Sequence, residues 1–365
     1  FMAAELLLLS EANETGLPVL LIEEPEAHLH PQLQLRLMEF LETKALEAGV
    51  QVIVTTHSPT LAAKADVESL TMMGSGQAYA LAAKHTHLTP GDYRFLRRFL
   101  DATKSNLFFA GGVVIVEGDA ENVLLPVLAR LLGRPFTKHR VSVVNVGHVG
   151  LFRYARIFLR KDGRLPPVRI ACLTDRDIPP EAARAYVKAK SPTRDVGNDF
   201  SAQKIDGIVA ALKKGDAGVV RTFVSPGWTL EHDLALGNAA KQVHVAVSIA
   251  KELKNHDGIF GEAEHAAALT AAATYYDQHL AALGAEERAA RIYEPMFKKQ
   301  ASKPETAQVL ADILIAANLD AIASRALLPH YLVEAIDYVT GADTPVPAAG
   351  AGAPVTANAN PAPAH

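Results

Sequence analysis

The sequence predicts an α/β protein in which a parallel sheet forms the central domain and a helical extension follows it. The runs 113–116 and 168–174 are apolar without alternation, which is typical of strands covered on both faces. Residues 18–57 have the order strand, helix, strand, which favours a parallel pair. From 233 to 338 the apolar spacing is helical almost throughout. These observations indicate a partial α/β segment, a parallel-sheet α/β domain and a helical C-terminal region, in that order.

Local patterns predict the individual helices and strands, and turn-forming residues separate them. A helix is already under way at 2–10. The expected strands are 18–24, 50–57, 69–73, 77–82, 113–116, 140–146, 168–174 and, at an edge, 218–224. The expected helices before the C-terminal region are 32–48, 92–101, 122–132 and 151–159. Breaks in the C-terminal region fall at Gly258, Gly284, Lys303-Pro304 and Pro329. The tail 341–365 has almost no large apolar side chain, so we expect it to be disordered.

Length and composition limit the class of protein. With 365 residues, of which 49% are hydrophobic, the chain can build about two domains with proper cores. The apolar stretch 6–9 is far shorter than the roughly 20 residues that cross a bilayer, and the first residues lack the basic region of a signal peptide. The single cysteine, Cys172, excludes an internal disulfide and lies in an apolar run. We therefore expect a cytoplasmic protein with a buried thiol, and the start at Phe1 indicates a fragment.

Acidic residues follow two of the apolar strands. Glu117 comes directly after the first run, and Glu121 lies about one helical turn later, past a glycine. Asp175 and Asp177 follow the second run, and in an extended chain positions i and i+2 point to the same side. Ligands bind at the carboxyl ends of strands in open α/β sheets. We therefore expect the four carboxylates to face one site.

Four carboxylates in one place require a counter-charge, because without cations they would repel one another and some would protonate. Hard oxygen ligands suit Mg²⁺ or Mn²⁺ and do not suit zinc. Two such ions about 4 Å apart can stabilise both the attacking and the leaving oxygen of a phosphoryl transfer. Each acidic pair alone is commonly a structural turn or cap, but two pairs that both end parallel-type strands favour a metal site.

Two acidic motifs resemble those of a Toprim domain, the fold shared by topoisomerases, bacterial primases and certain nucleases. They are Glu-Gly-Asp-Ala-Glu at 117–121 and Thr-Asp-Arg-Asp at 174–177. The segment 20–31 resembles the Walker B and D-loop region of ABC-type ATPases, and 54–59 resembles their switch histidine. An ABC-type ATPase end joined to a Toprim domain is the arrangement of OLD-family (overcoming lysogenization defect) nucleases. The resemblance covers residues 1–235 well and the helical remainder more loosely.

The resemblance implies roles for particular positions in the nuclease site. The acids that match metal-binding positions are Glu117, Glu121, Asp175, Asp177 and, in a later motif, Glu231. Lys303 is similar to a late lysine that assists phosphodiester cleavage, although its neighbours depart from the small and basic residues usual there. The residues with implied catalytic roles are therefore Glu117, Asp175 and Lys303. A lysine near two metal ions can neutralise charge in the transition state.

The first 90 residues resemble an ATPase site that is incomplete. By this resemblance Glu23 holds Mg²⁺ through water, Glu24 activates the attacking water and His57 contacts the γ-phosphate, with Glu23 standing where an aspartate is usual. The chain has no glycine-rich phosphate loop, so we expect ATP to bind only in the full-length protein. His28 and His30, together with Glu26, are an alternative zinc site, but their spacing recurs in the family motif and histidine near a helix start is an ordinary cap.

Two stripes of arginine are candidates for contacts with DNA. Arg94, Arg97 and Arg98 have helical spacing before the first acidic motif, and Arg153 and Arg156 have it between the two motifs. Contacts to backbone phosphates would give affinity without base specificity. Such runs are also common on solvated faces, and a formal net charge of −4 does not by itself mark a nucleic-acid binder.

The motifs and the resemblance predict a DNA endonuclease that hydrolyses phosphodiesters with two Mg²⁺ or Mn²⁺ ions. Its expected parts are an ATPase end (1–90), a Toprim domain (91–235), a helical extension (236–340) and the tail. A homodimer through the ATPase region and a partner protein stay open. One alternative is a topoisomerase-like or primase-like enzyme, but no tyrosine lies in a segment typical of a nucleophile and one cysteine cannot build a zinc module. The other is a non-catalytic ATP-driven DNA clamp with a structural metal.

Overall fold

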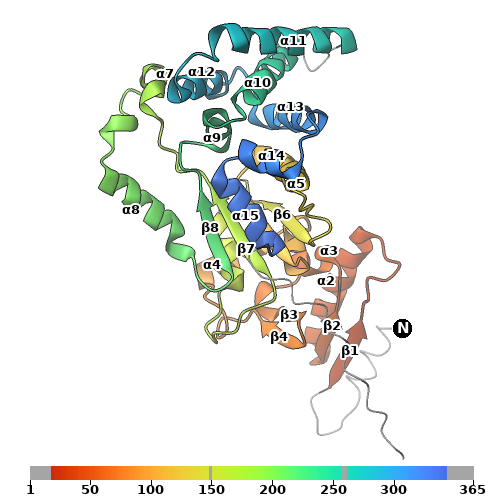
Figure 1. The fold of residues 1–365 in the computed structure, drawn as a ribbon. Helices are drawn as coiled ribbons and strands as arrows, with labels where there is room; N and C mark the ends of the chain where they lie inside the picture. Colours follow the sequence, from red (N-terminus) through yellow and green to blue (C-terminus); the bar gives the residue numbers. More distant parts are fainter. Residues whose placement is uncertain (1–17, 148–149, 256–260, 343–365) are drawn as a thin grey trace, which may run out of the picture.

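A four-stranded parallel sheet lies at the centre of the molecule, in the order β6-β5-β7-β8 (Figure 1). The structure is a computed structural model that describes residues 18–147, 150–255 and 261–342. The strands are β5 (Gly112–Val116), β6 (Val141–Asn145), β7 (Arg169–Thr174) and β8 (Val220–Val224). Every residue of β5 is buried, as its unalternating apolar run predicts. The predicted parallel-sheet α/β fold is confirmed, with β8 at an edge.

Two hydrophobic cores cover the two faces of this sheet. Because side chains alternate along a strand, Val114 and Val116 face one core while Val113 and Ile115 face the other. The first core includes α5 (Asp119–Leu131) and α15 (His330–Thr340), and α15 crosses the strands in Figure 1. The second core includes α4 (Pro90–Phe99) and α6 (Leu151–Ala155). Cys172 is buried in the second core, as expected.

A smaller unit precedes the central sheet. In it β1 (Val19–Glu23) and β2 (Gln51–Thr55) pair in parallel, joined by α2 (Pro31–Ala48) as predicted. His30 is the N-cap of α2 and its Nδ1 accepts the backbone N–H of Gln32 at 3.4 Å, which supports the cap over the zinc pair. The elements that follow are α3 (Pro59–Lys64) and the antiparallel pair β3 (Thr71–Gly74) and β4 (Gln77–Ala80).

The chain beyond β8 is helical, as its apolar spacing predicts. Helices α10 to α12 lie at the end of the molecule away from β1 and β2 (Figure 1). Two of the remaining helices, α7 (Arg184–Lys190) and α8 (Ala202–Leu212), lie between β7 and β8 in the chain. Those after β8 are α9 (Leu230–Leu236), α10 (Ala240–Asn255), α11 (Glu262–His279), α12 (Ala285–Phe297), α13 (Lys303–Ala316) and α14 (Ala321–Leu327). The breaks predicted at Gly284, Lys303 and Pro329 are confirmed. Among the described residues, no helix combines the length and the apolar character needed to cross a bilayer.

Some expected boundaries change for local reasons. The helix expected at 151–159 leaves α-helical geometry after Ala155 and becomes a 3₁₀ turn, Arg156–Phe158. The chain then extends, because the Leu159 carbonyl accepts the N–H of His87 at 2.9 Å. The expected helix 2–10, the break at Gly258 and the tail beyond residue 342 lie outside the described residues.

Candidate active site

The strand order creates a crevice between β5 and β7. From β5 the chain moves to β6 on one side and then returns to β7 on the other, so the connections diverge at the carboxyl ends of these two strands. Such a switch point is where open α/β sheets bind ligands. Glu117 follows β5 and Asp175 follows β7, and the hydroxyl of Thr174 donates to Glu117 Oε1 at 2.6 Å. The structure therefore places the two predicted acids on either side of the crevice.

Glu121 reaches the same place because α5 begins earlier than expected. Gly118 is its N-cap, with extended backbone, so the helix starts at Asp119 and Glu121 lies in the first turn. A carboxylate there is favoured by the positive end of the helix dipole. A small pocket of about 10 Å³ is lined by Glu121 and Asp175, among other residues. This volume is about that of one water molecule or one ion.

Glu231 and Lys303 come from the helical region and complete the cluster. Glu231 lies in the first turn of α9, is 5% exposed, and accepts from the Thr229 hydroxyl at 2.9 Å. Lys303 is the first residue of α13, and its Nζ lies 2.9 Å from Glu231 Oε2 and 5.7 Å from the centre of the Tyr293 ring. The backbone N–H of Leu230 donates to Asp175 Oδ1 at 3.0 Å, which joins α9 to the end of β7.

The protonation of these groups is strongly coupled. Burial, and then the neighbouring Glu231 carboxylate, raise the pKa of Asp175 well above its usual value. The same two causes raise the pKa of Glu121. Burial alone would lower the pKa of Lys303, but Glu231 and the other anionic neighbours outweigh it and raise this pKa. Lys303 is therefore a fixed positive charge beside carboxylates that resist full ionisation.

The donor set fits a hard divalent cation. Glu117, Asp175 and Glu231 each use one carboxylate oxygen in the contacts above, and in the described part of the chain no hydrogen bond engages the second oxygen. Carboxylate oxygens are the ligands that Mg²⁺ and Mn²⁺ prefer. Within the described ranges, however, no three acidic, histidine or cysteine side chains converge closely enough to form a preformed ion site. The chemistry of the residues suits the ion, and binding requires the carboxylates to come closer together.

The structure does not bring Asp177 to this cluster. Its backbone has φ 55°, which breaks the extended geometry that would point Asp175 and Asp177 to the same side. The Asp177 side chain is 71% exposed and accepts from Arg194 at 2.8 Å and from the Trp228 indole N–H at 3.3 Å. The sequence argument therefore does not hold at this residue, because a turn replaces the end of the strand.

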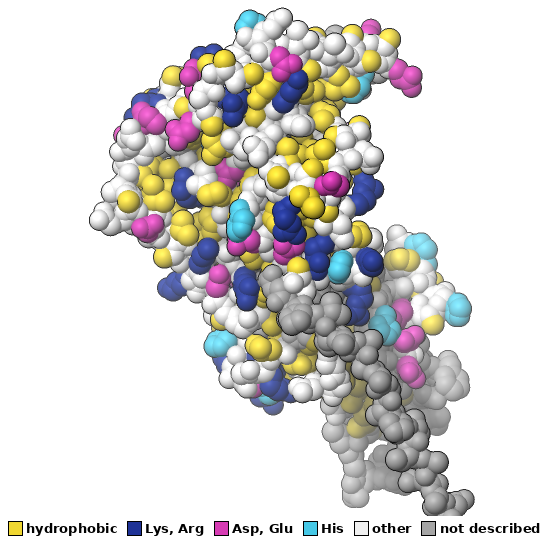
Figure 2. Space-filling model, in the orientation of Figure 1, with side chains coloured by type: hydrophobic (Ala, Val, Ile, Leu, Met, Phe, Trp, Pro, Cys, Tyr) yellow, Lys and Arg dark blue, Asp and Glu magenta, His cyan; other side chains and the backbone are white. Residues whose placement is uncertain are grey.

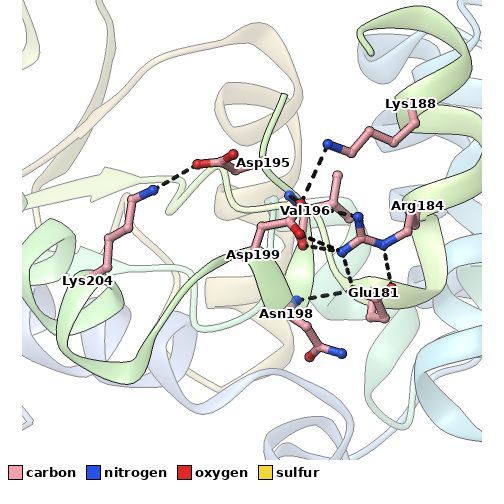
Figure 3. Close-up of polar contacts among 8 residues, drawn as sticks. All are labelled: Glu181, Arg184, Lys188, Asp195, Val196, Asn198, Asp199 and Lys204. Atoms are coloured by element: carbon pink, nitrogen blue, oxygen red, sulfur yellow. Dashed lines mark hydrogen bonds and ion pairs between the residues drawn. The ribbon is translucent and has the colours of Figure 1, made fainter. Parts of the chain in front are cut away.

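A polar network orders the segment that carries Arg194. Figure 3 shows the Arg184 guanidinium between Glu181 and Asp199. Its Nη2 donates to Glu181 Oε2 at 2.8 Å, to Asp199 Oδ1 at 3.0 Å and to the Val196 carbonyl at 3.0 Å. Gly197 has φ 46°, and a Cβ there would lie 2.6 Å from the backbone nitrogen of Glu181. The network therefore fixes the loop that holds Asp177 away from the other acids.

Sequence reasoning missed the residues that shape the loop before α9. Asp233 accepts the backbone N–H groups of Gly227 and Trp228, both at 3.1 Å. A Cβ on Gly227 would lie 2.0 Å from Asp233 Oδ1, so the loop requires glycine there. The only signal was a glycine before an acid-rich helix start, which is too common to single out. Tyr293 beside Lys303 gave no sequence signal.

The residues that resemble an ATPase site also meet at strand ends. Glu23 pairs with Thr55 across β1 and β2, and His57 Nε2 lies 3.5 Å from Glu24 Oε1. Glu26 holds this end of the site, because its Oε1 accepts the backbone N–H of His57 at 2.8 Å. Sequence reasoning considered Glu26 only with the zinc pair and missed this role.

The arginines expected to contact DNA have different environments. Arg153 Nε and Arg156 Nη1 lie 3.7 and 2.6 Å from the carboxylate of Asp92, whose side chain is 3% exposed. Arg97 pairs with Asp66, whereas Arg94 is exposed and has no ion-pair partner among the described residues. On the face drawn in Figure 2, Lys and Arg side chains lie among Asp and Glu and do not form one continuous basic patch.

Asp92 explains why two of these arginines lie where they do. Thr89 is the N-cap of α4, and Asp92 completes a capping box with it, accepting the Thr89 N–H at 2.9 Å. Because α4 starts at Pro90, before the expected position, Asp92 faces inward. Burial would raise the pKa of Asp92, but hydrogen bonds from Thr89 and Arg156 outweigh it and lower this pKa.

We expect Arg156→Ala to lower the free energy of unfolding by about 1–2 kcal/mol near pH 7, below the range for a fully buried pair because the Arg156 side chain is 35% exposed. The loss should shrink below about pH 4. The pKa of Asp92 is lower in the folded protein than in the unfolded chain, so its contact with Arg156 stabilises the fold fully above the unfolded pKa. That stabilisation is lost as the pH falls further and the Asp92 carboxylate becomes protonated. Urea unfolding at several pH values measures both effects. Arg94→Ala is the control, and an equal loss in both variants would contradict the Asp92 contact.

Comparison with known proteins supports the two motif assignments. Residues 3–63 match the family described as "AAA domain, putative AbiEii toxin, Type IV TA system". Residues 108–177, which include Glu117, Glu121 and Asp175, match the family described as "Overcoming lysogenization defect protein-like, TOPRIM domain". The second match makes this part of the chain similar to OLD-family proteins. The OLD-type Toprim match spans β5, β6 and β7, the strands that form the crevice.

Two curated relatives that are similar to this chain have nuclease names. The Old nuclease of Escherichia phage P2 is 30% identical over 156 residues, which cover 40% of this chain and 26% of that protein. Endonuclease GajA of Bacillus cereus (strain HuB5-5) is 25% identical over 150 residues, covering 34% of this chain and 22% of that protein. The chain therefore spans about a quarter of the length of these relatives.

Solved structures of OLD C-terminal regions are also similar to part of this chain. That from Xanthomonas campestris pv. campestris is 22% identical, covers 65% of this chain and 95% of that chain, and has a TM-score of 0.37. That from Burkholderia pseudomallei is 20% identical, covers 64% and 98%, and has a TM-score of 0.36.

Proposed function

We propose that this chain contains the nuclease site of a metal-dependent DNA endonuclease. The observation that supports this most directly is the cluster at the switch point. There Glu121 and Asp175 line a space of ionic size, Glu117 and Glu231 are the neighbouring carboxylates, and Lys303 pairs with Glu231. The nuclease names of the two curated relatives agree with this reading. Hydrolysis of a phosphodiester requires both anion stabilisation and a positioned water, and this cluster offers groups for each.

Each residue has a proposed role in the reaction. Glu117 and Asp175 hold cations at the two strand ends, and Glu121 and Glu231 complete the donor set from the helix starts. Divalent cations bound there would supply Lewis-acid stabilisation of the phosphate oxygens. Lys303 carries a positive charge that its neighbours keep protonated, so it can stabilise negative charge developing at the scissile phosphate. The Thr174 and Thr229 hydroxyls orient Glu117 and Glu231.

The proposal further includes two metal ions in the nuclease site and a separate site that takes part in ATP hydrolysis. Carboxylates from both strand ends, with one unengaged oxygen on three of them, provide enough donors for two Mg²⁺ or Mn²⁺ ions. Glu23, Glu24 and His57 at the ends of β1 and β2 are placed to contribute to ATP hydrolysis in a longer protein that supplies a phosphate loop and a second subunit. DNA is the proposed substrate, and Arg94 and Arg98, which are exposed and have no ion-pair partner in the described part of the chain, can contact its backbone.

Supercoiled plasmid tests the function directly. We expect nicked and linear products with 5 mM MgCl₂ or MnCl₂ and none with EDTA. Thermal unfolding should also shift upward when either cation is added, because the cation binds the folded state and reduces repulsion among the acids. Stabilisation without cleavage would identify a structural ion and contradict the nuclease. A protein–DNA adduct that survives denaturant would instead indicate topoisomerase chemistry.

A further inference from the structure

A second pocket lies at the end of the sheet where β7 and β8 begin, whereas the candidate active site lies at the carboxyl ends of the strands. Its volume is about 750 Å³, within the range of small-molecule sites. Its wall includes Gly163 to Leu165, which lead into β7, and the residues Gly215, Ala217 and Gly218, which lead into β8. The acids follow the carboxyl ends of the strands, so the length of β7 separates the two sites by about 20 Å. A ligand in this pocket does not contact the cluster of acids.

The wall of this pocket is positively charged. Its charged side chains are those of Arg156, Arg160, Arg164 and Lys214. Asp162 pairs with Arg160 and with Arg164, and Asp92 pairs with Arg156. Lys214 is exposed and has no ion-pair partner among the described residues. Four cations against two carboxylates leave an excess of about two positive charges, which favours an anionic ligand.

Apolar side chains occupy another part of the same wall. Phe152 is half-buried, and Leu165 is 61% exposed although it is large and apolar. Gly215 lies beside the Phe152 ring, where a Cβ would come within 3.7 Å of it, so the absence of a side chain leaves room there. Aromatic rings are surfaces on which nucleic-acid bases stack. The pocket therefore combines a stacking surface with a cationic one.

We infer that this pocket binds a nucleotide unit, with the base against Phe152 and Leu165 and the phosphate near Lys214 and Arg156. The phosphate of a monoester carries about −1.5 to −2 charges at pH 7, which matches the positive excess of the wall. The unit can be a free mononucleotide or one nucleotide of a DNA strand. This inference does not rest on the nuclease proposal, because it concerns binding at a different edge of the sheet.

Calorimetric titration in EDTA tests the pocket without cleavage. The probes are deoxyadenosine monophosphate, a short single-stranded oligodeoxyadenylate and inorganic phosphate. We expect Lys214→Glu to weaken binding of the nucleotide probe by about 10- to 100-fold, because a charge-assisted contact is lost. Ala211→Trp, which fills the pocket from an exposed position on α8, should abolish binding. Lys213→Glu is the matched control, since Lys213 is the exposed neighbour that does not line the pocket.

Each outcome has a defined meaning. Binding of the monophosphate that both pocket variants lose supports a free-nucleotide site, and binding of the oligonucleotide alone supports a site for a DNA strand. If Lys213→Glu and Lys214→Glu weaken nucleotide binding equally, the effect reflects the overall charge of this surface and not a contact in the pocket, which would overturn the assignment. Inorganic phosphate that binds as tightly as the nucleotide would overturn the role of Phe152. No binding of any probe by the wild type would overturn the inference altogether.

Discussion

Asp175→Asn is expected to reduce plasmid cleavage at least about 100-fold, more than the loss typical of a residue that only supports a metal ligand. The amide removes a charge that a cation needs, yet its oxygen can still accept the Leu230 N–H that now reaches Asp175 Oδ1 at 3.0 Å. Because burial and Glu231 raise the pKa of Asp175, the neutral amide should also relieve repulsion in the cation-free protein.

The two effects therefore have opposite signs, which makes this variant informative. We expect the melting temperature without cation to rise by about 1–2 °C, the shift for about 1 kcal/mol in a chain of 365 residues. The further rise on adding MnCl₂ should be largely lost. Asp206→Asn on exposed α8 is the matched control and should change neither cleavage nor melting. Cleavage by Asp175→Asn at the wild-type rate would refute the proposed metal site.

Lys303→Met is expected to lower cleavage by about 10²- to 10³-fold, the cost of removing one preorganised group that stabilises transition-state charge. It should also destabilise the protein by about 1–2 kcal/mol, because Glu231 is buried and loses its cation. The figure is below that of a fully buried pair because the Lys303 side chain is 41% exposed and water screens it.

A double variant tests whether the stability lost in Lys303→Met comes from the unpaired Glu231 carboxylate. Glu231→Gln removes that carboxylate, so Lys303→Met with Glu231→Gln should recover most of the lost stability. Because Glu231 is itself a proposed cation ligand, cleavage is compared between the wild type and Lys303→Met alone. Lys298→Met, at an exposed lysine paired with Glu294, is the control for loss of a surface charge. If Lys303→Met cleaves as fast as the wild type at a temperature where both proteins are folded, the lysine acts only as a counter-ion for Glu231.

Several parts of the site could be predicted because they depend on neighbours in the chain. The strand before Glu117 and the strand before Asp175 are buried on both faces, and their apolar composition shows this directly. Parallel strands in one sheet bring their carboxyl ends to one edge, so the two acids had to be close if the strands were adjacent. Glu121 followed from helical spacing once the turn at Gly118 was recognised.

Other parts depended on contacts that no local pattern encodes. Asp177 turns away because its backbone adopts φ 55° and Arg194 binds its carboxylate. Arg156 contacts a buried carboxylate because a capping box turned Asp92 inward. In both cases a short, strong electrostatic contact outweighed the weak directional preference on which the sequence argument relied.

The sequence alone was sufficient for the fold class, the strands of the central sheet and the acids that follow β5 and β7, since apolar periodicity and turn residues act over a few positions. It did not indicate the helices α3, α7 and α8. Tertiary structure decided which charges meet. Lys303 and Glu231 lie 2.9 Å apart although 72 positions separate them (303 − 231), and this depends on how α9 and α13 pack on the sheet. The pocket between the starts of β7 and β8 likewise exists only after folding, because its walls come from segments distant in the chain.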